Sequence, residues 1–209
     1  ASTVVRDQLE EAGMDPGRIW VVPYGADERT FPKRRQTPGG PFRICFAGRQ
    51  SLRKGLHYLL KALDLAGQKD WELHCFGMPL QETAADLAAY RGAASVRQRG
   101  SVAQAELGRA FGEMRVLVLP SAEEAFGLVV VQALQAGLPC IVSDRVGAKD
   151  LIREGENGSI VPFGDIEALA EALRFWSRNG ITVPDCFPWS ECARKLLEVA
   201  GAFGAPFER

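Results

Sequence analysis

Short apolar runs alternate with longer amphipathic stretches along most of the chain. The short runs are typical of strands buried on both faces of a parallel sheet, and the longer stretches repeat apolar residues at helical spacing. This alternation predicts an α/β fold with a doubly wound parallel sheet. Strands are expected at residues 43–47, 71–76, 96–99, 115–119, 140–142 and 159–161, and helices at residues 54–67, 81–90, 103–113, 127–136, 149–153, 165–178 and 190–200.

The segment before residue 42 follows a different pattern. Residues 2–13 predict a short helix, residues 19–22 a strand and residues 23–27 a turn. Residues 33–41 are rich in basic residues, proline and glycine, so they predict a linker without a core of its own.

Composition and charge place the chain among compact globular proteins. Its 209 residues are 46% hydrophobic, which is enough for one domain with additions. With 25 Lys and Arg against 26 Asp and Glu residues, no overall field favours nucleic acid or an anionic membrane, so phosphate binding must be local. No run reaches the roughly 20 apolar residues of a membrane span, and no leader opens the chain. The first residue, Ala1, fits a fragment and a trimmed chain equally well.

The cysteines indicate a reducing compartment. They are odd in number and form no CxxC pair, and three of them lie in strand-like apolar runs, where free cysteine behaves as a small hydrophobe. We therefore expect free thiols and a cytoplasmic location. The cysteines are Cys45, Cys75, Cys140, Cys186 and Cys192.

The strongest chemical signal lies between the predicted strand 115–119 and the predicted helix 127–136. Glu124 supplies a carboxylate there, and Gly127 lets bare backbone turn sharply beside a ligand. A helix that starts at Gly127 directs unpaired N–H groups and the positive end of its dipole beyond the strand, which favours an anionic ligand. The alternative is an ordinary strand-loop-helix unit in which Glu124 is a solvated surface acid.

A basic loop follows the first strand of the domain. It contains Gly48, Arg49 and Lys54, and its guanidinium and ammonium groups suit a diphosphate. The loop is neither a Walker A motif nor a GxGxxG motif, and the alternative is a solvated surface loop. Because ligands bind beyond the carboxyl ends of parallel strands, this loop and the Glu124 segment are expected to share one crevice.

Several short motifs occur in a particular order along the chain. They are Val22-Pro23-Tyr24-Gly25-Ala26-Asp27, Gly48-Arg49 with Lys54-Gly55, Gly100-Ser101-Val102, Pro120-Ser121 with Glu124-Ala125-Phe126-Gly127-Leu128, Glu154-Gly155, Asn157-Gly158-Ser159-Ile160-Val161-Pro162 with Gly164-Asp165, and Pro188-Trp189-Ser190. In this order they resemble retaining glycosyltransferases of family 4 (glycosyl transferases group 1), which have the GT-B fold. The chain looks like the C-terminal, nucleotide-sugar-binding half of such an enzyme. The resemblance implies a Rossmann-like domain over residues 37–209, preceded in residues 1–36 by the tail of an N-terminal acceptor domain and the hinge.

The resemblance also implies roles for individual residues. Arg49 and Lys54 would hold the donor's diphosphate, Glu124 would face the hydroxyls of the donor sugar, and residues 100–102 would lie against the nucleobase. A UDP- or GDP-type donor is implied, with no cofactor and no metal, since cationic side chains and a helix terminus can neutralise a leaving diphosphate. The implied catalytic set is Glu124, Arg49 and Lys54, and the implied donor-binding set is Gly48, Arg49, Lys54, Val102, Phe126, Gly127, Leu128, Val129 and Gln132.

Gln132 departs from the family pattern. The family motif has two glutamates separated by seven intervening residues, and counted from Glu124 the second position here is Gln132. An amide keeps one acceptor oxygen but replaces the other with donors, so contact with the ribose hydroxyls should weaken by roughly 1 kcal/mol. The change is compatible with altered donor preference and with a degenerate, non-catalytic copy.

The implied reaction transfers a hexose, with retained stereochemistry, to an acceptor such as a glycan or glycolipid. By resemblance, the acceptor site and a contributing catalytic histidine lie in a preceding domain of which this chain holds only the tail. We therefore expect the chain alone to bind donor weakly and to be inactive. Its expected partners are the donor and the acceptor domain, with no nucleic acid and at most peripheral membrane contact in the full-length enzyme. His57 and His74 lack an orienting partner in the sequence and are interpreted as structural.

Two other hypotheses stand beside the enzyme. A non-catalytic module that senses or scaffolds a nucleotide sugar would keep the fold and lose the chemistry. An unrelated flavodoxin-like or sugar-epimerase domain would bind nucleotide through a different loop, so that Arg49→Ala would leave nucleotide binding unchanged.

Overall fold

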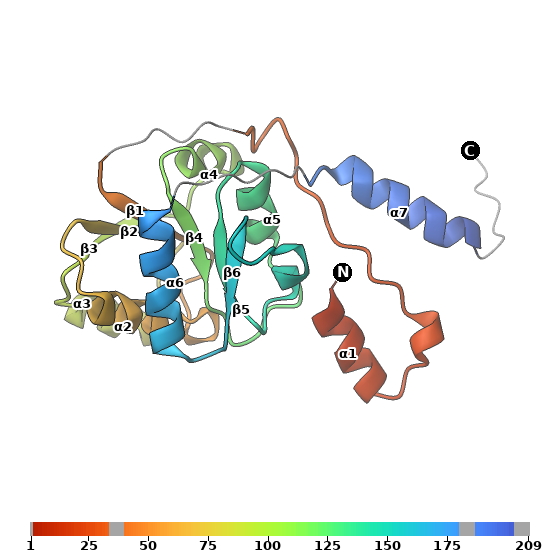
Figure 1. The fold of residues 1–209 in the computed structure, drawn as a ribbon, viewed down its shortest axis with the longest axis horizontal. Helices are drawn as coiled ribbons and strands as arrows, with labels where there is room; N and C mark the ends of the chain where they lie inside the picture. Colours follow the sequence, from red (N-terminus) through yellow and green to blue (C-terminus); the bar gives the residue numbers. More distant parts are fainter. Residues whose placement is uncertain (1, 34–39, 180–186, 203–209) are drawn as a thin grey trace.

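The centre of the molecule is a single parallel sheet (Figure 1), in a computed structural model that describes residues 2–33, 40–179 and 187–202. Within these residues six strands follow the order β3-β2-β1-β4-β5-β6. The order reverses between β1 and β4, which is the switch point of a doubly wound, Rossmann-like sheet. The strands are β1 (Phe42–Ala47), β2 (Trp71–Phe76), β3 (Ser95–Gly100), β4 (Val116–Leu119), β5 (Cys140–Ser143) and β6 (Gly158–Val161). The predicted fold class is confirmed.

Helices cover both faces of the sheet. One face packs against α2 (Leu56–Ala66), α3 (Gln81–Ala89) and α6 (Ile166–Arg178), and the other against α4 (Gln104–Phe111) and α5 (Leu128–Gln135). Each helix lies where the amphipathic pattern predicted one, with ends that differ by a few residues.

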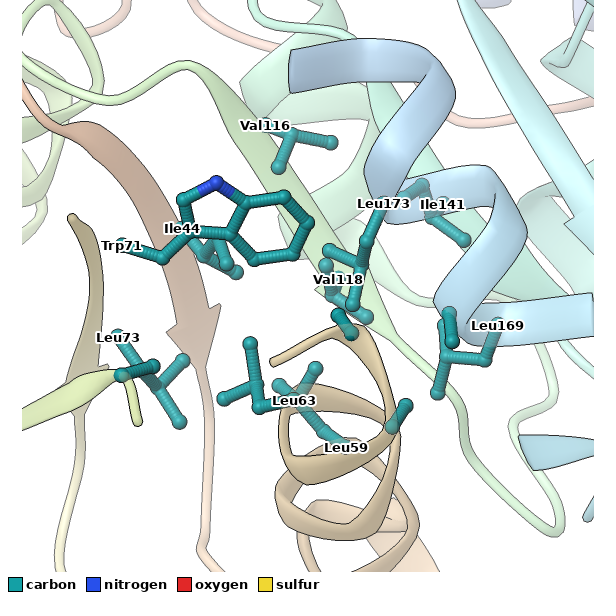
Figure 2. Close-up of a cluster of buried hydrophobic side chains, with 14 of the residues drawn as sticks. Ile44, Leu59, Leu63, Trp71, Leu73, Val116, Val118, Ile141, Leu169 and Leu173 are labelled. Carbon is teal, nitrogen blue, oxygen red and sulfur yellow. The ribbon is translucent and has the colours of Figure 1, made fainter. Parts of the chain in front are cut away.

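The core on the α2 and α6 side explains why the strands read as continuous apolar runs. Figure 2 shows Trp71 and Ile44 of the sheet packed near Leu63 of α2 and Leu173 of α6, all of them buried. Alternate strand residues face the opposite core, where Cys45 is fully buried. Both faces of the central strands are therefore buried, as expected for a parallel sheet, whereas the edge strand β3 is mostly exposed.

Two helices begin at side-chain caps that hold their first turns. The Asp165 carboxylate accepts a hydrogen bond from the backbone N–H of Ala168 at 2.9 Å, at the start of α6. The Ser2 hydroxyl likewise accepts from the N–H of Val5 at 3.3 Å, at the start of α1 (Thr3–Glu11). Both residues were predicted as caps or helix starts from the sequence.

The two ends of the described chain lie apart from the sheet. Figure 1 shows α1 and α7 (Trp189–Ala202) to one side of the body that contains the sheet. The segments that join them to this body run side by side, because the Ala26 N–H donates to the Phe187 carbonyl at 2.7 Å. The predicted boundary at residues 36 and 37, most of the predicted linker and Cys186 lie outside the described residues. Among the helices that the structure describes, none is both long and apolar enough to span a bilayer.

Three local predictions were wrong. Residues 19–22 lie outside the sheet, and the turn expected at residues 23–27 forms later, where the Asp27 carboxylate accepts hydrogen bonds from the N–H groups of Arg29 and Thr30. The helix expected at residues 149–153 is the 3₁₀ helix η3 (Gly147–Leu151). An apolar pattern alone does not make a strand, because the backbone also needs a neighbouring strand with which to form hydrogen bonds.

Candidate functional site

Two loops meet beyond the carboxyl ends of β1 and β4. The Lys54 ammonium forms an ion pair with the Glu124 carboxylate, and the two side chains are only 15% and 18% exposed. Backbone and side-chain contacts tie the loops together beside this pair: the Ala122 N–H donates to the Arg53 carbonyl at 2.8 Å, and the Arg53 guanidinium donates to the Glu123 carbonyl at 2.7 Å. The two predicted loops are therefore in contact, and we refer to the region around this ion pair as the crevice.

Gly55 allows the loops to approach each other. Its φ of 75° lies in the left-handed region, and a Cβ at this position would lie 2.0 Å from the Pro120 carbonyl oxygen. Any side chain would push the 3₁₀ helix η2 (Leu52–Lys54) away from the end of β4. The glycine thus sets Lys54 beside Glu124.

The start of α5 lies against the same carboxylate. Gly127, with a φ of 94°, precedes the helix, and no side chain caps the first turn. A Cβ on Gly127 would lie 3.3 Å from Cγ of Glu124, so the helix start adjoins this side chain. Uncapped N–H groups at a helix N-terminus attract anions. An ammonium group and a helix N-terminus therefore flank the Glu124 carboxylate.

Bonds to the neighbouring loop fix the Glu124 backbone. Its N–H donates to the Arg145 carbonyl at 3.2 Å, and its carbonyl accepts from the Gly147 N–H at 2.9 Å. Because both backbone groups are held, the side chain has a defined starting point in the crevice.

A cavity of about 370 Å³ opens beyond the carboxyl ends of β1, β2 and β3. Its walls are mostly apolar, with the Arg49 side chain among the lining groups. A mainly apolar cavity with a few polar groups is typical of a small-molecule site. It brings the predicted residues Gly48 and Arg49 together with Val102, which lies far from them in the sequence. Residues that line it include Gly48, Arg49, Phe76, Gly77, Val102 and Leu107.

The charge of Lys54 depends on its surroundings. Burial, with a smaller contribution from the neighbouring Arg53 guanidinium, lowers the pKa of Lys54 to about 8. With this pKa the amine is mostly protonated near neutral pH, and the Glu124 carboxylate supports the charge as its ion-pair partner. A diphosphate in the crevice would provide the same support.

The other predicted residues lie on α5 or just before it. Leu128 is 46% exposed, and Val129 and Gln132 are half-buried. Leu128 and Val129 precede Gln132 by four and three residues, so they share a helix face with it. Phe126 is buried, with its ring centroid 4.9 Å from that of Tyr24, so its side chain belongs to the core. Contact between any of these residues and a donor stays a prediction.

His74 has partners that the sequence did not reveal. Its ring is buried within β2, Nε2 lies 3.1 Å from a Glu72 carboxylate oxygen, and the Arg99 guanidinium donates to Nδ1 at 3.2 Å. These contacts join strands, so the structural interpretation of His74 holds. Burial lowers the pKa of the half-buried His57. Across residues 2–33, 40–179 and 187–202, no three His, Cys, Asp or Glu side chains group as metal ligands would.

Gln50 is a residue that the sequence did not single out. It is fully buried beneath the cavity loops, and its amide nitrogen contacts the Gly77 carbonyl and the Gln98 side chain. A glutamine between Arg49 and Ser51 looks like any polar loop residue, so no sequence signal could have identified it.

The chain matches the family described as Glycosyl transferases group 1 over residues 27–195. It is 32% identical to a phosphatidyl-myo-inositol mannosyltransferase of Mycobacterium leprae over 93% of this chain and 55% of that protein. It is 37% identical to a D-inositol 3-phosphate glycosyltransferase of Streptomyces coelicolor over 83% of this chain and 45% of that protein. The chain thus spans about half the length of these curated relatives.

Solved structures show the same fold. Anabaena HepE in complex with UDP and glucose superimposes with a TM-score of 0.76 at 19% identity, covering 96% of this chain and 62% of that one. The C-terminal domain of the glycosyl transferase group 1 protein LpcC of Francisella tularensis superimposes with a TM-score of 0.63 at 17% identity, covering 82% of this chain and 98% of that one. The family match over residues 27–195, together with the 37% identity to the Streptomyces coelicolor protein, shows that the chain belongs to the glycosyl transferases group 1 family.

Proposed function

We propose that this chain is the donor-binding domain of a retaining, metal-independent glycosyltransferase that moves a hexose from a nucleoside diphosphate sugar to a glycan or glycolipid acceptor. Family membership supports a glycosyltransferase. The observation that carries the proposal is the meeting of Lys54, Glu124 and the uncapped start of α5 in one crevice beside the Arg49 cavity.

The crevice offers what a departing diphosphate needs. When the bond between the sugar's anomeric carbon and the phosphate oxygen breaks, negative charge grows on the diphosphate. The Arg49 guanidinium, the Lys54 ammonium and the N–H groups of Leu128 and Val129 are the groups we assign to that charge. Donors that are fixed in place before the reaction stabilise developing charge without reorganising.

Glu124 has a second role in this proposal. In this structure it neutralises Lys54. When the diphosphate takes over Lys54, the carboxylate is released to accept hydrogen bonds from hydroxyls of the donor sugar. The exchange keeps the ammonium paired throughout, which matters because burial lowers its pKa.

The donor that we propose is of the UDP or GDP type, and the acceptor site lies in another domain. Anabaena HepE is described in complex with UDP and glucose, which supports a nucleotide sugar. Because the chain spans about half of its curated relatives, the remaining half is the proposed acceptor domain, and residues 1–36 are its proposed tail and hinge. Any membrane contact of the whole enzyme would be peripheral.

We also propose a cytoplasmic location. Cys45, Cys75 and Cys140 are buried free thiols, and burial raises the pKa of Cys75 to about 12. Protonated, buried thiols serve as core residues and need no oxidising compartment.

Gln132 supports a second candidate, a non-catalytic module that binds a nucleotide sugar. It stands on the accessible side of α5, where the family pattern places a carboxylate. The amide would weaken the contact with ribose and leave the diphosphate crevice in place.

Two measurements distinguish these candidates. Calorimetric titration of the chain with UDP, GDP and ADP tests donor binding, and hydrolysis of the matching nucleotide sugar by the full-length protein tests catalysis. Glu124→Ala should reduce hydrolysis about a hundredfold or more while UDP binding is retained, because the sugar contact is lost and the diphosphate contacts stay. Glu123→Gln is the matched control, since Glu123 is the exposed neighbour of Glu124.

Each outcome selects one candidate. Loss of hydrolysis in Glu124→Ala, with normal hydrolysis in Glu123→Gln, supports the enzyme. Nucleotide binding without hydrolysis in the unsubstituted full-length protein supports the non-catalytic module. A chain that binds none of the three nucleotides contradicts both.

A further inference from the structure

Gln50 joins two loops and a strand beside the cavity. Its backbone extends the pairing between β1 and β2, since its N–H donates to the Met78 carbonyl at 3.1 Å and its carbonyl accepts from the Leu80 N–H at 3.0 Å. Its side-chain amide donates to the Gly77 carbonyl at 2.7 Å and to the Gln98 side-chain oxygen at 2.8 Å. One residue of the β1 loop therefore contacts the loop after β2 and the strand β3.

The loops that Gln50 joins are the walls of the cavity. Gly48 and Arg49 immediately precede it, Gly77 is its hydrogen-bond partner, and Val102 follows β3 by two residues. The β1 and β2 loops are closely packed at Gly77, because a Cβ there would lie 2.1 Å from the Gly48 carbonyl oxygen. A shift of the Gln50 amide would thus move the walls relative to one another.

The buried amide has an energetic cost that packing alone does not explain. Gln50 is fully buried, and its side-chain oxygen has no hydrogen-bond partner among the described residues. An unsatisfied buried acceptor is destabilising, and an apolar side chain of similar size would avoid this penalty. A buried polar side chain with fixed hydrogen bonds specifies one arrangement of the segments that it joins, which an apolar side chain cannot do.

We propose that Gln50 is a positioning residue that sets the width of the nucleobase end of the donor site, and through it the selection among nucleoside diphosphates. The inference rests on the proposed function, because it assigns the cavity beside Arg49 to the base of the donor. Gln50 touches no ligand in this proposal. It acts through the walls formed by the β1 and β2 loops and the end of β3.

The test compares Gln50→Leu with a matched control. Gln135→Leu is that control: Gln135 is also buried, at 2% exposure, and its side-chain oxygen accepts from the Phe187 N–H at 2.7 Å, outside the cavity lining. Gln50→Met, which is unbranched and close in length, replaces Gln50→Leu if that variant does not fold. Each chain is titrated with UDP, GDP and ADP, and thermal unfolding is followed in parallel.

The readout is the ratio of affinities between the tightest-binding nucleotide and the other two. All three share the diphosphate, so this ratio isolates the base cavity from the Lys54 crevice. We expect the Gln50 variants to lower the ratio about tenfold, the scale on which pocket shape discriminates ligands. Gln135→Leu should lower the unfolding temperature and leave the ratio unchanged.

The outcomes separate this inference from the proposed function. A ratio that is unchanged in the Gln50 variants, or an unsubstituted chain that binds all three nucleotides equally well, overturns the inference and leaves donor binding intact. An unsubstituted chain that binds none of them overturns the proposed function, and the inference with it.

Discussion

At the scale of single residues, Lys54 carries a charge that depends on pH. Burial lowers its pKa to about 8, whereas arginine stays charged throughout the accessible range. The ammonium form attracts a diphosphate and the neutral amine does not. Affinity for UDP should therefore be nearly constant below pH 8 and should fall as the pH rises through the pKa.

We predict that the dissociation constant of the chain for UDP rises above about pH 8 by up to tenfold per pH unit, because the amine loses its proton. Titration calorimetry between pH 7 and pH 9.5 measures this dependence. In Lys54→Arg the guanidinium stays protonated, so the dependence should disappear over the same range. An identical pH profile in the two proteins would contradict the assignment of Lys54 to the diphosphate.

The sequence identified the charged groups of the site but not their pairing. Arg49, Lys54 and Glu124 were singled out because they follow predicted strands. That Lys54 and Glu124 neutralise each other depends on two loops seventy residues apart being brought into contact. The expected parallel sheet predicted that the two loops lie at the same edge, but a sequence pattern does not determine which of their side chains pair.

At the scale of elements, two glycines of similar conformation differ in their neighbours. Gly55 precedes α2 and Gly67 follows it, with φ of 75° and 67°. A Cβ on Gly55 would lie 2.0 Å from the Pro120 carbonyl oxygen, whereas a Cβ on Gly67 would come no closer than 3.9 Å to any neighbour. The pair therefore separates the cost of a left-handed backbone from the cost of a steric clash.

We predict that Gly67→Ala destabilises the chain by about 1 kcal/mol, since alanine is strained in the left-handed region. Gly55→Ala should destabilise it by about 3 kcal/mol, because the clash with β4 adds to the same strain. Urea unfolding measures both values. Equal values for the two variants would show that the contact between Gly55 and Pro120 relaxes at little energetic cost, and would argue against its role in placing Lys54.

The sheet was predictable because its strands are apolar on both faces. β2 (Trp71–Phe76) was expected at the residues where it forms, since Trp71, Leu73 and Cys75 face one core while its other face is also largely covered. Residues 19–22 have a similar apolar pattern but lie outside the sheet. Of these four residues only Val22 is buried, and Trp20 is 43% exposed, so a local apolar pattern predicts a strand only when the topology supplies a partner.

At the scale of the whole molecule, α1 is attached to the body through its first residues. None of the residues within α1 is buried. The Thr3 N–H and hydroxyl donate to the Asp150 carboxylate at 2.6 Å and 2.5 Å, and the Ser2 hydroxyl donates to the Ala125 carbonyl at 2.6 Å. A carboxylate at a helix N-terminus is favourably placed, so these few contacts set the position of α1 beside the Glu124 loop.

We predict that Asp150→Ala speeds backbone hydrogen exchange in α1 about tenfold, because the helix loses its charged anchor, and leaves exchange in the sheet unchanged. Hydrogen-exchange mass spectrometry measures both regions in one experiment. Asp7→Ala is the control, since Asp7 forms an ion pair with Arg6 of the same helix. Unchanged exchange in α1 of Asp150→Ala would show that other contacts hold the helix.

The sequence by itself determined the α/β class, the approximate position of each strand and most helices, and the charged residues that follow β1 and β4, because these follow from local periodicity and chemistry. Only the tertiary structure decided that Lys54 pairs with Glu124, that Gly55 must lack a side chain, and that Gln50 joins the walls of the cavity. Each of these depends on contact between segments far apart in the chain. Such contacts are fixed by packing the whole sheet and its helices together, which no short stretch of sequence records.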